Sequence, residues 1–275
     1  MMKKLLSTAV SVLPKSAQSQ IRDRYWQTKS RLLYQSFYRW MKLENTLRTG
    51  ITLQIASKGE WWVYNDIFVN GEYDAPILQA LEKCSPLRPL TVLDLGANVG
   101  FFTLRVVDLV RQTRPECRID ITMVEASPRV FDELKARIHS QALHEVNLRM
   151  VQGLVGRRTG SASLQESALH VKNTIMNGNS RSGNTIPFID LSLLMEPVEE
   201  IDLLKCDIEG AELLFLENYE DLLGKVKSAV FEFHHEMCDT GKCRAILLRN
   251  AFRETVLRTT PTFSVNLLTR DRISA

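Results

Sequence analysis

Apolar runs and segments of helical periodicity alternate along residues 51–275. Five runs have the length and composition of buried strands: Thr91–Leu95, Ile119–Val124, Val146–Val151, Ile201–Cys206 and Ser228–Phe233. Segments with helical spacing lie among them: 74–84, 101–110, 128–138, 210–219 and 245–256. This alternation predicts an α/β domain with a parallel sheet and right-handed crossovers.

Three regions depart from the simple alternation. "TLQIA", "WWVYND" and "IFVNGEYD", between Ile51 and Asp74, resemble short strands separated by turn residues. The segment after Val151 predicts a β-hairpin through Gly160, and residues 165–185 lack periodicity and predict an acceptor-side loop. The closing "TTPTFSVNLLTRD" contains an apolar strand, which we expect to belong to an antiparallel hairpin at the sheet edge.

Residues 18–47 predict a helix, because large apolar side chains recur there at intervals of seven, four and three among basic residues. Of the 35 Lys and Arg and 32 Asp and Glu in the chain, residues 1–50 hold ten and two, leaving 25 and 30 for residues 51–275. The helix either caps the main domain, which we favour, or lies on an anionic membrane or phosphorylated polymer. We therefore divide the chain into a basic N-terminal helical arm, residues 1–50, and a main domain, residues 51–275.

Five cysteines, an odd number without a CxxC pair, indicate a reducing compartment rather than a disulfide framework. A zinc site of Cys238 and Cys243 with His234 and His235 matches no familiar spacing, so we favour ordinary thiols. No apolar run reaches the roughly 20 residues of a membrane helix. The first residues resemble a signal peptide, with two lysines and then an apolar run, but this run ends early, at Pro14. We expect a cytoplasmic protein, with peripheral contact at the inner membrane surface through residues 1–45 as an alternative role of the arm.

"LTVLDLGANVGFFTLRVVDLV" is the most informative stretch. A strand ends in an acid, Asp94, and a glycine-bearing turn of the form D-x-G-x-N-x-G leads into a helix. Such a turn lets a ligand approach the backbone and the helix N-terminus. The acid is unfavourable for a pyrophosphate but suits S-adenosylmethionine, which carries an ammonium and a sulfonium. The predicted cofactor-binding residues here are Asp94, Gly96, Asn98, Gly100 and Phe101.

The second strand ends in Glu125, followed by Ala126-Ser127-Pro128, where the proline suits a first helical position. An acid at this place accepts hydrogen bonds from both ribose hydroxyls of a bound nucleoside. Pairing of Glu125 with a surface arginine is the structural alternative. Gly153 and Leu154 follow the third strand, where an adenine ring could lie. We assign Glu125, Ala126, Ser127, Gly153 and Leu154 to cofactor binding.

Taken together, these motifs resemble the FkbM-type S-adenosylmethionine-dependent methyltransferases. The resemblance runs from about Ile67 to His235 and is carried by "IFVNGEYD", "VLDLGANVGFFT", "VEASP", "IDLLKCDIEGAE" and "FEFHH" in that order. It implies a Rossmann-like class I methyltransferase fold, with a mostly parallel seven-stranded sheet and helices on both faces. It also implies S-adenosylmethionine as methyl donor and O-methylation of hydroxyls, often on sugars, glycans or secondary metabolites.

Carboxylates at the ends of the fourth and fifth strands are the catalytic candidates. Asp207 and Glu209 follow the strand expected beside the first, so both belong near the transferable methyl, and Asp207 is assigned to the cofactor as well. Glu232 and His234 end the next strand, and His234 has the better unperturbed pKa for a general base. In the alternative, Asp207 and Glu209 only cap the following helix. We expect Glu212 to be a solvated helix residue.

Other interpretations stay open. Asp207, Glu209 and His234 could hold a divalent metal, but nothing in the sequence fixes three ligands, so no metal is assigned. An RNA acceptor would use the basic arm for phosphates, yet the chain has no two adjacent prolines and so lacks the motif of base N-methylating enzymes. A non-catalytic, membrane-associated scaffold is the third alternative. We expect a small-molecule or glycan hydroxyl acceptor and no nucleic acid; the sequence leaves the oligomeric state open.

Overall fold

The structure is a computed structural model that describes residues 38, 40–41, 43–85, 87–165, 174–176 and 185–270. Most of the predicted arm helix, residues 18–47, lies outside these residues. Where the two overlap the prediction is wrong at its end, because Leu43–Thr46 form strand β1. No helix of the described part is both long and apolar enough to span a bilayer.

A seven-stranded sheet forms the centre of the molecule, in the order β11-β12-β10-β9-β3-β4-β5. Strands β3, β4, β5, β9 and β10 run parallel, β12 runs antiparallel to β10, and β11 runs antiparallel to β12, which confirms the mostly parallel sheet. The strands are β3 (Leu90–Leu95), β4 (Ile119–Glu125), β5 (Val146–Gln152), β9 (Ile201–Cys206), β10 (Val226–His234), β11 (Phe252–Thr259) and β12 (Phe263–Arg270). Every residue of β9 is buried, as expected for a strand covered on both faces.

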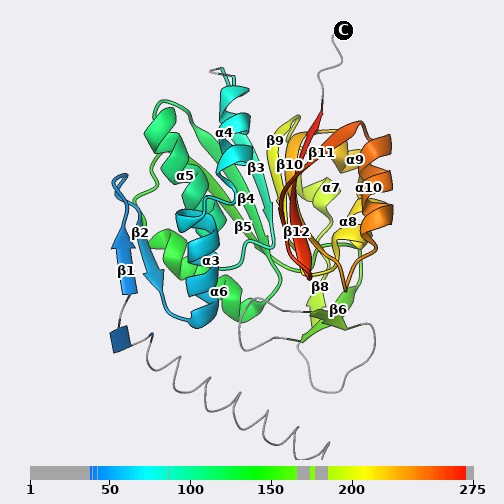
Figure 1. The fold of residues 1–275 in the computed structure, drawn as a ribbon, viewed down its shortest axis with the longest axis horizontal. Helices are drawn as coiled ribbons and strands as arrows, with labels where there is room; N and C mark the ends of the chain where they lie inside the picture. Colours follow the sequence, from blue (N-terminus) through cyan, green and yellow to red (C-terminus); the bar gives the residue numbers. More distant parts are fainter. Residues whose placement is uncertain are drawn as a thin grey trace, which may run out of the picture.

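Two helical layers cover the sheet (Figure 1). The first consists of α4 (Asp74–Glu82), α5 (Phe101–Thr113) and α6 (Pro128–His139). The second consists of α7 (Leu191–Leu194), α8 (Glu212–Asn218), α9 (Glu220–Leu223) and α10 (Thr240–Arg249). Each layer buries its own apolar cluster against the strands, so the carboxyl ends of the parallel strands are the open edge between them.

The segment before α4 is helical, which makes the strands expected from "WWVYND" and "IFVNGEYD" wrong. Lys58–Tyr64 form helix α3, which continues as a π-helix, η1 (Asn65–Val69). A capping box starts α3: the Ser57 hydroxyl accepts from the Glu60 amide at 3.1 Å, and the Ala56 amide donates to Glu60 Oε2 at 3.1 Å. This local capping outweighs the β-propensity of the aromatic residues.

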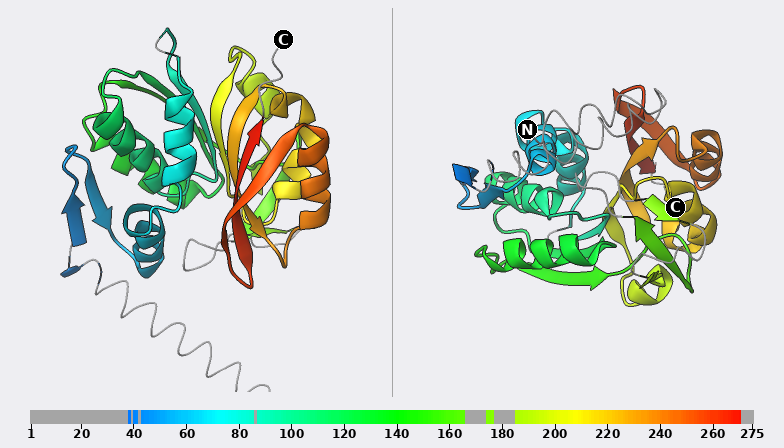
Figure 2. Two further views of the ribbon diagram at one scale, coloured as in Figure 1. Left: turned by 45° about the horizontal axis from the view of Figure 1, so that its top comes forward. Right: turned by 90° about the horizontal axis from the view of Figure 1, so that it is seen from below.

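A hairpin of β1 (Leu43–Thr46) and β2 (Thr52–Ile55) precedes α3. It is tied to the end of α6, because the Gln141 side chain accepts from the Thr52 amide at 3.0 Å and donates to the Thr52 carbonyl at 2.9 Å. The hairpin and β11 lie on opposite sides of the molecule (Figure 2). The boundary predicted after residue 50 falls in the hairpin turn, and the division into two domains stays a prediction.

The helix predicted over Ala245–Val256 is wrong beyond Arg249. Ala251 adopts a left-handed conformation (φ 63°), and the chain reverses into β11. This strand pairs along its length with β12, as the predicted edge hairpin requires. Burial against β12 therefore decides the conformation of residues whose local pattern is ambiguous.

The hairpin predicted through Gly160 is also wrong. Leu154 forms an isolated parallel bridge with Phe188, and its amide donates to the Pro187 carbonyl at 2.9 Å. β6 (Ser161–Gln165) pairs with β7 (Thr174–Met176) and β8 (Thr185–Pro187) in a small separate sheet. Much of the predicted acceptor-side loop, 165–185, lies outside the described residues.

Candidate active site

The glycine turn after β3 packs directly against the end of β9. Gly96 has φ +74°, and a Cβ atom there would lie 1.7 Å from the carbonyl oxygen of Asp207. Gly100, at φ +89°, precedes α5, and a Cβ there would come within 2.7 Å of Leu134. The predicted turn is therefore present, and Gly96 brings its backbone into contact with the strand end that carries the catalytic candidates.

Asp94 lies beneath this turn and is completely buried. Its carboxylate accepts from the Thr103 hydroxyl at 3.0 Å and lies 3.5 Å from Lys205 Nζ. Lys205 in turn donates to the Gly96 carbonyl at 2.8 Å. Burial raises the pKa of Asp94, and the Lys205 ammonium opposes that shift. Asp94 thus contacts the turn through Lys205, and it does not line the cavity over the carboxyl ends of β3, β9 and β10.

Glu125 stands at the end of β4 and is bound by backbone amides. Its two carboxylate oxygens accept from Asn98 N at 2.9 Å and from Ser127 N at 2.8 Å. Burial raises the pKa of Glu125, while these two amides lower it. The Ser127 hydroxyl also accepts from the Val130 amide and caps α6. Glu125 therefore joins the first turn to the second, and the arginine pairing considered above is not its contact.

Gly153 and Leu154 belong to a closely packed wall. A Cβ at Gly153 would lie 2.4 Å from the Ile189 side chain, and Leu154 is 1% exposed. Ala126 packs against the same small cluster, which contains Leu154, Ile186 and Phe188. Gly153 and Leu154, where an adenine ring was expected, thus lie close to Ala126, which was assigned to the cofactor, although none of the three lines the cavity over the strand ends.

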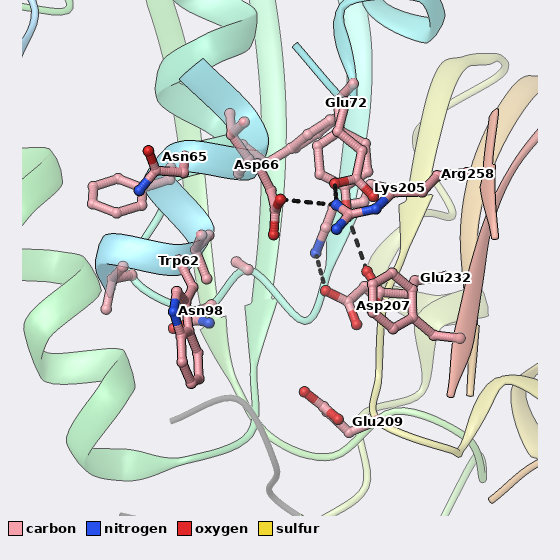
Figure 3. Close-up of a pocket in the computed structure, with 18 of the residues that line it drawn as sticks. Trp62, Asn65, Asp66, Glu72, Asn98, Lys205, Asp207, Glu209, Glu232 and Arg258 are labelled. Atoms are coloured by element: carbon pink, nitrogen blue, oxygen red, sulfur yellow. Dashed lines mark hydrogen bonds and ion pairs between the residues drawn. The ribbon is translucent and has the colours of Figure 1, made fainter. Parts of the chain in front are cut away.

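A cavity of about 550 Å³ opens over the carboxyl ends of β3, β9 and β10 (Figure 3). The glycine turn contributes Asn98 and Phe101 to its wall, and the strand ends contribute Asp207, Glu209 and Glu232. Of the predicted site residues, these five line the cavity. Asp207 and Glu209 are therefore more than helix caps, because their side chains face a space large enough for a ligand.

The His234 ring lies among several carboxylates of the site. Its Nε2 lies 3.3 Å from Glu209 Oε2 and 3.6 Å from Glu232 Oε1, and its Nδ1 lies 3.1 Å from Glu212 Oε1. Glu209 is held in the left-handed region at φ 52°, which is rare for a residue with a side chain and occurs at functional sites. Among the described residues, Asp207, Glu232 and His234 form the group able to hold a metal ion; Glu209 is not part of it.

Glu212 is fully buried, so its prediction as a solvated helix residue is wrong. Its place in the first turn of α8 lets it accept from the Gly210 amide at 3.1 Å and contact His234. The consequence for His234 is large. Burial opposes protonation, but the bond to Glu212 and the charges of Asp207, Glu212 and Glu209 raise the pKa of His234 to about 10. A pKa this high favours the imidazolium at neutral pH, which argues against the general-base role expected from the unperturbed pKa of His234.

Two carboxyl groups near His234, those of Glu209 and Glu232, also have raised pKa values. Burial, followed by repulsion from Asp207, raises the pKa of Glu209 to about 8 and raises the pKa of Glu232 well above its usual value. Glu232 has only long contacts: the Tyr73 hydroxyl donates to it at 3.5 Å, and His234 lies 3.6 Å away. Glu209 and Glu232 therefore keep their protons to a higher pH than usual, because their charged forms are buried and repelled by Asp207.

The cavity wall that faces the carboxylates was not predicted from the sequence, because its residues were assigned to short strands and turns. Helix α3 contributes Trp61 and Trp62, and η1 contributes Asn65 and Asp66 (Figure 3). The Ser57-x-x-Glu60 capping box was the available signal for this helix.

Arg258 crosses the cavity from the other edge of the sheet. It binds Asp66 at 2.8 Å and Glu72 at 2.7 Å, and it follows a register shift between Val256 and Arg258 in β11. β-Bulges commonly re-aim a side chain next to a functional site. No sequence signal predicted Arg258, because the first part of β11, as far as Val256, was assigned to a helix.

The remaining candidates lie apart from the carboxylates. Cys238 and Cys243 contact each other, with their sulfur atoms 3.3 Å apart, and all five cysteines are free thiols. His235 is exposed, and its amide donates to the Thr262 carbonyl. The set proposed for zinc is therefore not assembled, since neither His235 nor the two thiols join a metal-binding group among the described residues.

Sheet order, glycine turn and acidic strand ends together define the chain as a Rossmann-like methyltransferase. Residues 94–254 match the Methyltransferase FkbM domain, which is more than half of the chain. The protein belongs to the FkbM methyltransferase family. This membership confirms the family predicted from the sequence and its methyl donor, S-adenosylmethionine.

Solved structures with a related fold are distant. Magnesium protoporphyrin IX methyltransferase from Synechocystis PCC 6803, solved with bound SAM, is 14% identical, with 89% of this chain and 96% of that chain covered and a TM-score of 0.45. The bifunctional kinase-methyltransferase WbdD is 15% identical over 76% of this chain and 41% of that chain, with a TM-score of 0.44. TrmK from M. capricolum, in complex with S-adenosyl-homocysteine, is 9% identical over 71% and 67%, with a TM-score of 0.41. A search of curated proteins finds no match.

Proposed function

We propose that this protein is an S-adenosylmethionine-dependent O-methyltransferase that acts on a hydroxyl of a sugar, glycan or secondary metabolite. The observation that carries the proposal is the cavity at the strand ends, where the carboxylates of Asp207, Glu209 and Glu232 meet beside the glycine turn. Such a site can both favour a positively charged donor and accept the proton of a hydroxyl.

The residues present fit the donor. Asn98 lines the cavity, and its buried Oδ1 has no hydrogen-bond partner among the described residues, so it is free to accept from a ligand. Each carboxylate oxygen has two lone pairs, so Glu125 can accept from ribose hydroxyls while it holds its two backbone amides. When bound, the donor supplies an activated methyl group on a sulfonium, whose positive charge the carboxylates of the cavity complement.

Glu209 is the residue best placed to take the acceptor's proton. It lines the cavity, lies within 3.3 Å of His234 Nε2, and stands two residues beyond Asp207. In its ionised form, Glu209 would accept the proton of the acceptor hydroxyl as that oxygen is methylated. A carboxyl group whose pKa is raised to about 8 is suited to this role near neutral pH. His234 and Lys205 hold positive charge beside Glu209 and Asp207, which keeps those side chains oriented.

The wall opposite the carboxylates favours a hydroxylated ring as acceptor. Trp61 and Trp62 line the cavity and remain 38% and 45% exposed, so their faces can receive the apolar side of a sugar ring. Asp66 and Glu232 offer acceptors for its other hydroxyls. This combination of an aromatic wall with several carboxylates supports a sugar or a similar polyhydroxylated molecule.

The test has two stages. Calorimetry of the purified chain with S-adenosylhomocysteine measures donor-site binding, which Glu125→Ala should weaken and Asp132→Asn, an exposed carboxylate on α6, should leave unchanged. A mass-spectrometric screen of glycans and hydroxylated metabolites with S-adenosylmethionine then looks for the gain of one CH₂, with Glu209→Gln as the inactive control. Absence of S-adenosylhomocysteine binding to the wild type would refute the proposal.

The cellular setting is part of the same proposal. Five free thiols support a reducing compartment, and we place the protein in the cytoplasm. We also propose peripheral contact with the inner membrane surface through residues 1–45, on the strength of the basic charge of that segment. An RNA acceptor and a non-catalytic scaffold remain the competing functions, and methylated product in the screen would exclude the scaffold.

A further inference from the structure

We propose that Asp207, Glu232 and His234 form a binding site for one divalent metal ion. Each offers one ligand atom, and the three atoms lie within 4.8 Å of one another. Two features of the sheet bring them together. Glu232 and His234 are two residues apart on β10 and so point to one face, and Asp207 directly follows the neighbouring parallel strand β9.

His234 is oriented as a metal ligand is. Its Nδ1 contacts Glu212 Oε1 at 3.1 Å, and the Glu212 carboxylate is completely buried. A divalent ion that binds here would displace the Nε2 proton of His234. With the Nδ1 hydrogen still donated to Glu212, the Nε2 lone pair would then face Glu232 and Glu209. A buried carboxylate behind a histidine fixes the tautomer and raises the basicity of the ligating nitrogen.

The carboxylates of the site lack short contacts within the protein. Glu232 lies 3.5 Å from the Tyr73 hydroxyl and 3.6 Å from His234 Nε2, although its side chain is only 17% exposed. Lys205 Nζ lies 3.5 Å from Asp207 Oδ2, but its shorter bond is the one to the Gly96 carbonyl. The second oxygen of the buried Glu212 has no hydrogen-bond partner among the described residues. Partly buried carboxylates with such weak pairing are stabilised by a bound cation.

The donor set suggests the kind of ion. One imidazole and two carboxylates, with the cavity open for water or substrate, suit a first-row divalent ion such as Mn²⁺ better than Ca²⁺, which prefers oxygen ligands alone. The functional consequence rests on the proposed O-methyltransferase activity. An ion here would bind the acceptor hydroxyl and lower its pKa, while Glu209, outside the ligand set, accepts the proton.

Mn²⁺ is the probe for the test, because its free form is measured directly by electron paramagnetic resonance. The full chain is stripped with chelator, dialysed and titrated with MnCl₂ in the absence of donor. We expect one Mn²⁺ bound per chain and an affinity at least about 10-fold weaker in Glu232→Gln and in Asp207→Asn. Glu236→Gln, an exposed carboxylate on the turn after β10, is the matched control and should bind as the wild type does.

The proposal is overturned if the wild type leaves the free Mn²⁺ signal unchanged, or if Glu232→Gln and Asp207→Asn bind as tightly as Glu236→Gln. Circular dichroism establishes that each variant is folded, and Glu212→Gln, which leaves all three ligands in place, should weaken binding by about 10–100-fold. Calorimetry with S-adenosylhomocysteine in EDTA separates this proposal from the previous one. Donor binding without Mn²⁺ binding contradicts the metal site alone, and Mn²⁺ binding without donor binding contradicts the methyltransferase function alone.

Discussion

At the scale of single residues, the site depends on one close approach of two backbones. Gly96 and Asp207 come from strands that are distant in sequence, and their contact leaves no room for a Cβ atom. The turn that carries Asn98 is therefore held at a fixed distance from the carboxylates of β9. The motif explains Gly96 by the approach of a ligand to the backbone. In the structure, Gly96 also allows the turn after β3 to pack against the end of β9.

Gly96→Ala tests this contact. Both the positive φ and the overlap with the Asp207 carbonyl oppose the new side chain, and we expect a loss of about 3 kcal/mol in the free energy of unfolding. Gly160→Ala is the control: its φ is +94° but no atom lies within 4 Å of the added Cβ, so about 1 kcal/mol is expected. Urea unfolding measures both, and equal losses would show that the close approach is unimportant.

Glu125 gives a prediction about pH. Burial raises its pKa, with Lys205 opposing and Asp94 adding to the shift, so its proton is lost at a higher pH than in the unfolded chain. The ionised form accepts ribose hydroxyls better, so the affinity for S-adenosylhomocysteine should fall as pH decreases through this raised pKa. Glu125→Gln should bind more weakly at high pH and lose this dependence. A variant with an unchanged pH profile would assign the titration to another group, such as Asp94.

At the scale of elements, α3 and η1 form one wall of the cavity, and an arginine of β11 forms ion pairs that connect this wall to the sheet. Arg258 makes this link through Asp66 and Glu72, and Glu72 is only 7% exposed at its side chain. Burial raises the pKa of Glu72, and Arg258 lowers it again. A π-helix is rare and occurs mostly at functional sites, so its placement at the cavity agrees with a ligand-binding wall.

Arg258→Met should release this link. We expect a loss of about 1–2 kcal/mol, since Arg258 is partly exposed but Glu72 is left buried without its partner. In the double variant Arg258→Met/Glu72→Gln, part of that loss should return, because the orphaned charge is gone. Thermal unfolding of the two single variants and the double variant measures the coupling; strictly additive losses would contradict it.

At the scale of the whole molecule, the strongest asymmetry is one of charge. Residues 1–37 contain seven Lys and Arg and one Asp, whereas residues 51–275 are mildly acidic. The described fold begins close to β1, whose hairpin is tied to α6 and belongs with the main body. The two parts can therefore be separated between residue 37 and the hairpin without removing a described strand.

A chain that begins at residue 38 tests the proposed membrane contact. We expect it to lose co-sedimentation with vesicles that contain anionic lipid, because the basic segment supplies the attraction. Its binding of S-adenosylhomocysteine should equal that of the full chain, since every cavity residue is retained. Equal sedimentation of both chains would refute a membrane role for the segment.

Several elements could be predicted because their physical cause is local or repetitive. Strands β3 and β9 are buried along nearly their whole length, as strands covered on both faces are, and the glycine turn and Glu125 stand at fixed places relative to the parallel strands. Helix α3 was predicted as a strand because aromatic residues occur in both strands and helices. The local signal that distinguishes the two is the capping box of Ser57 and Glu60. The course of β11 could not be read from local pattern, since pairing with β12 decides it.

The sequence by itself determined the alternation of strands and helices from β3 to β10, the glycine turn, and the acids that end the strands, because each depends on the chemistry of neighbouring residues. The tertiary structure alone decided that Glu212 is buried behind His234, that Arg258 reaches η1, and that Asp207, Glu232 and His234 meet. These contacts depend on the register between strands that are distant in sequence and on which side chains are buried. Register and burial then decide the partners and the pKa of each side chain. The structure argues against the general-base role expected of His234 for that reason, because its pKa is raised among four carboxyl groups.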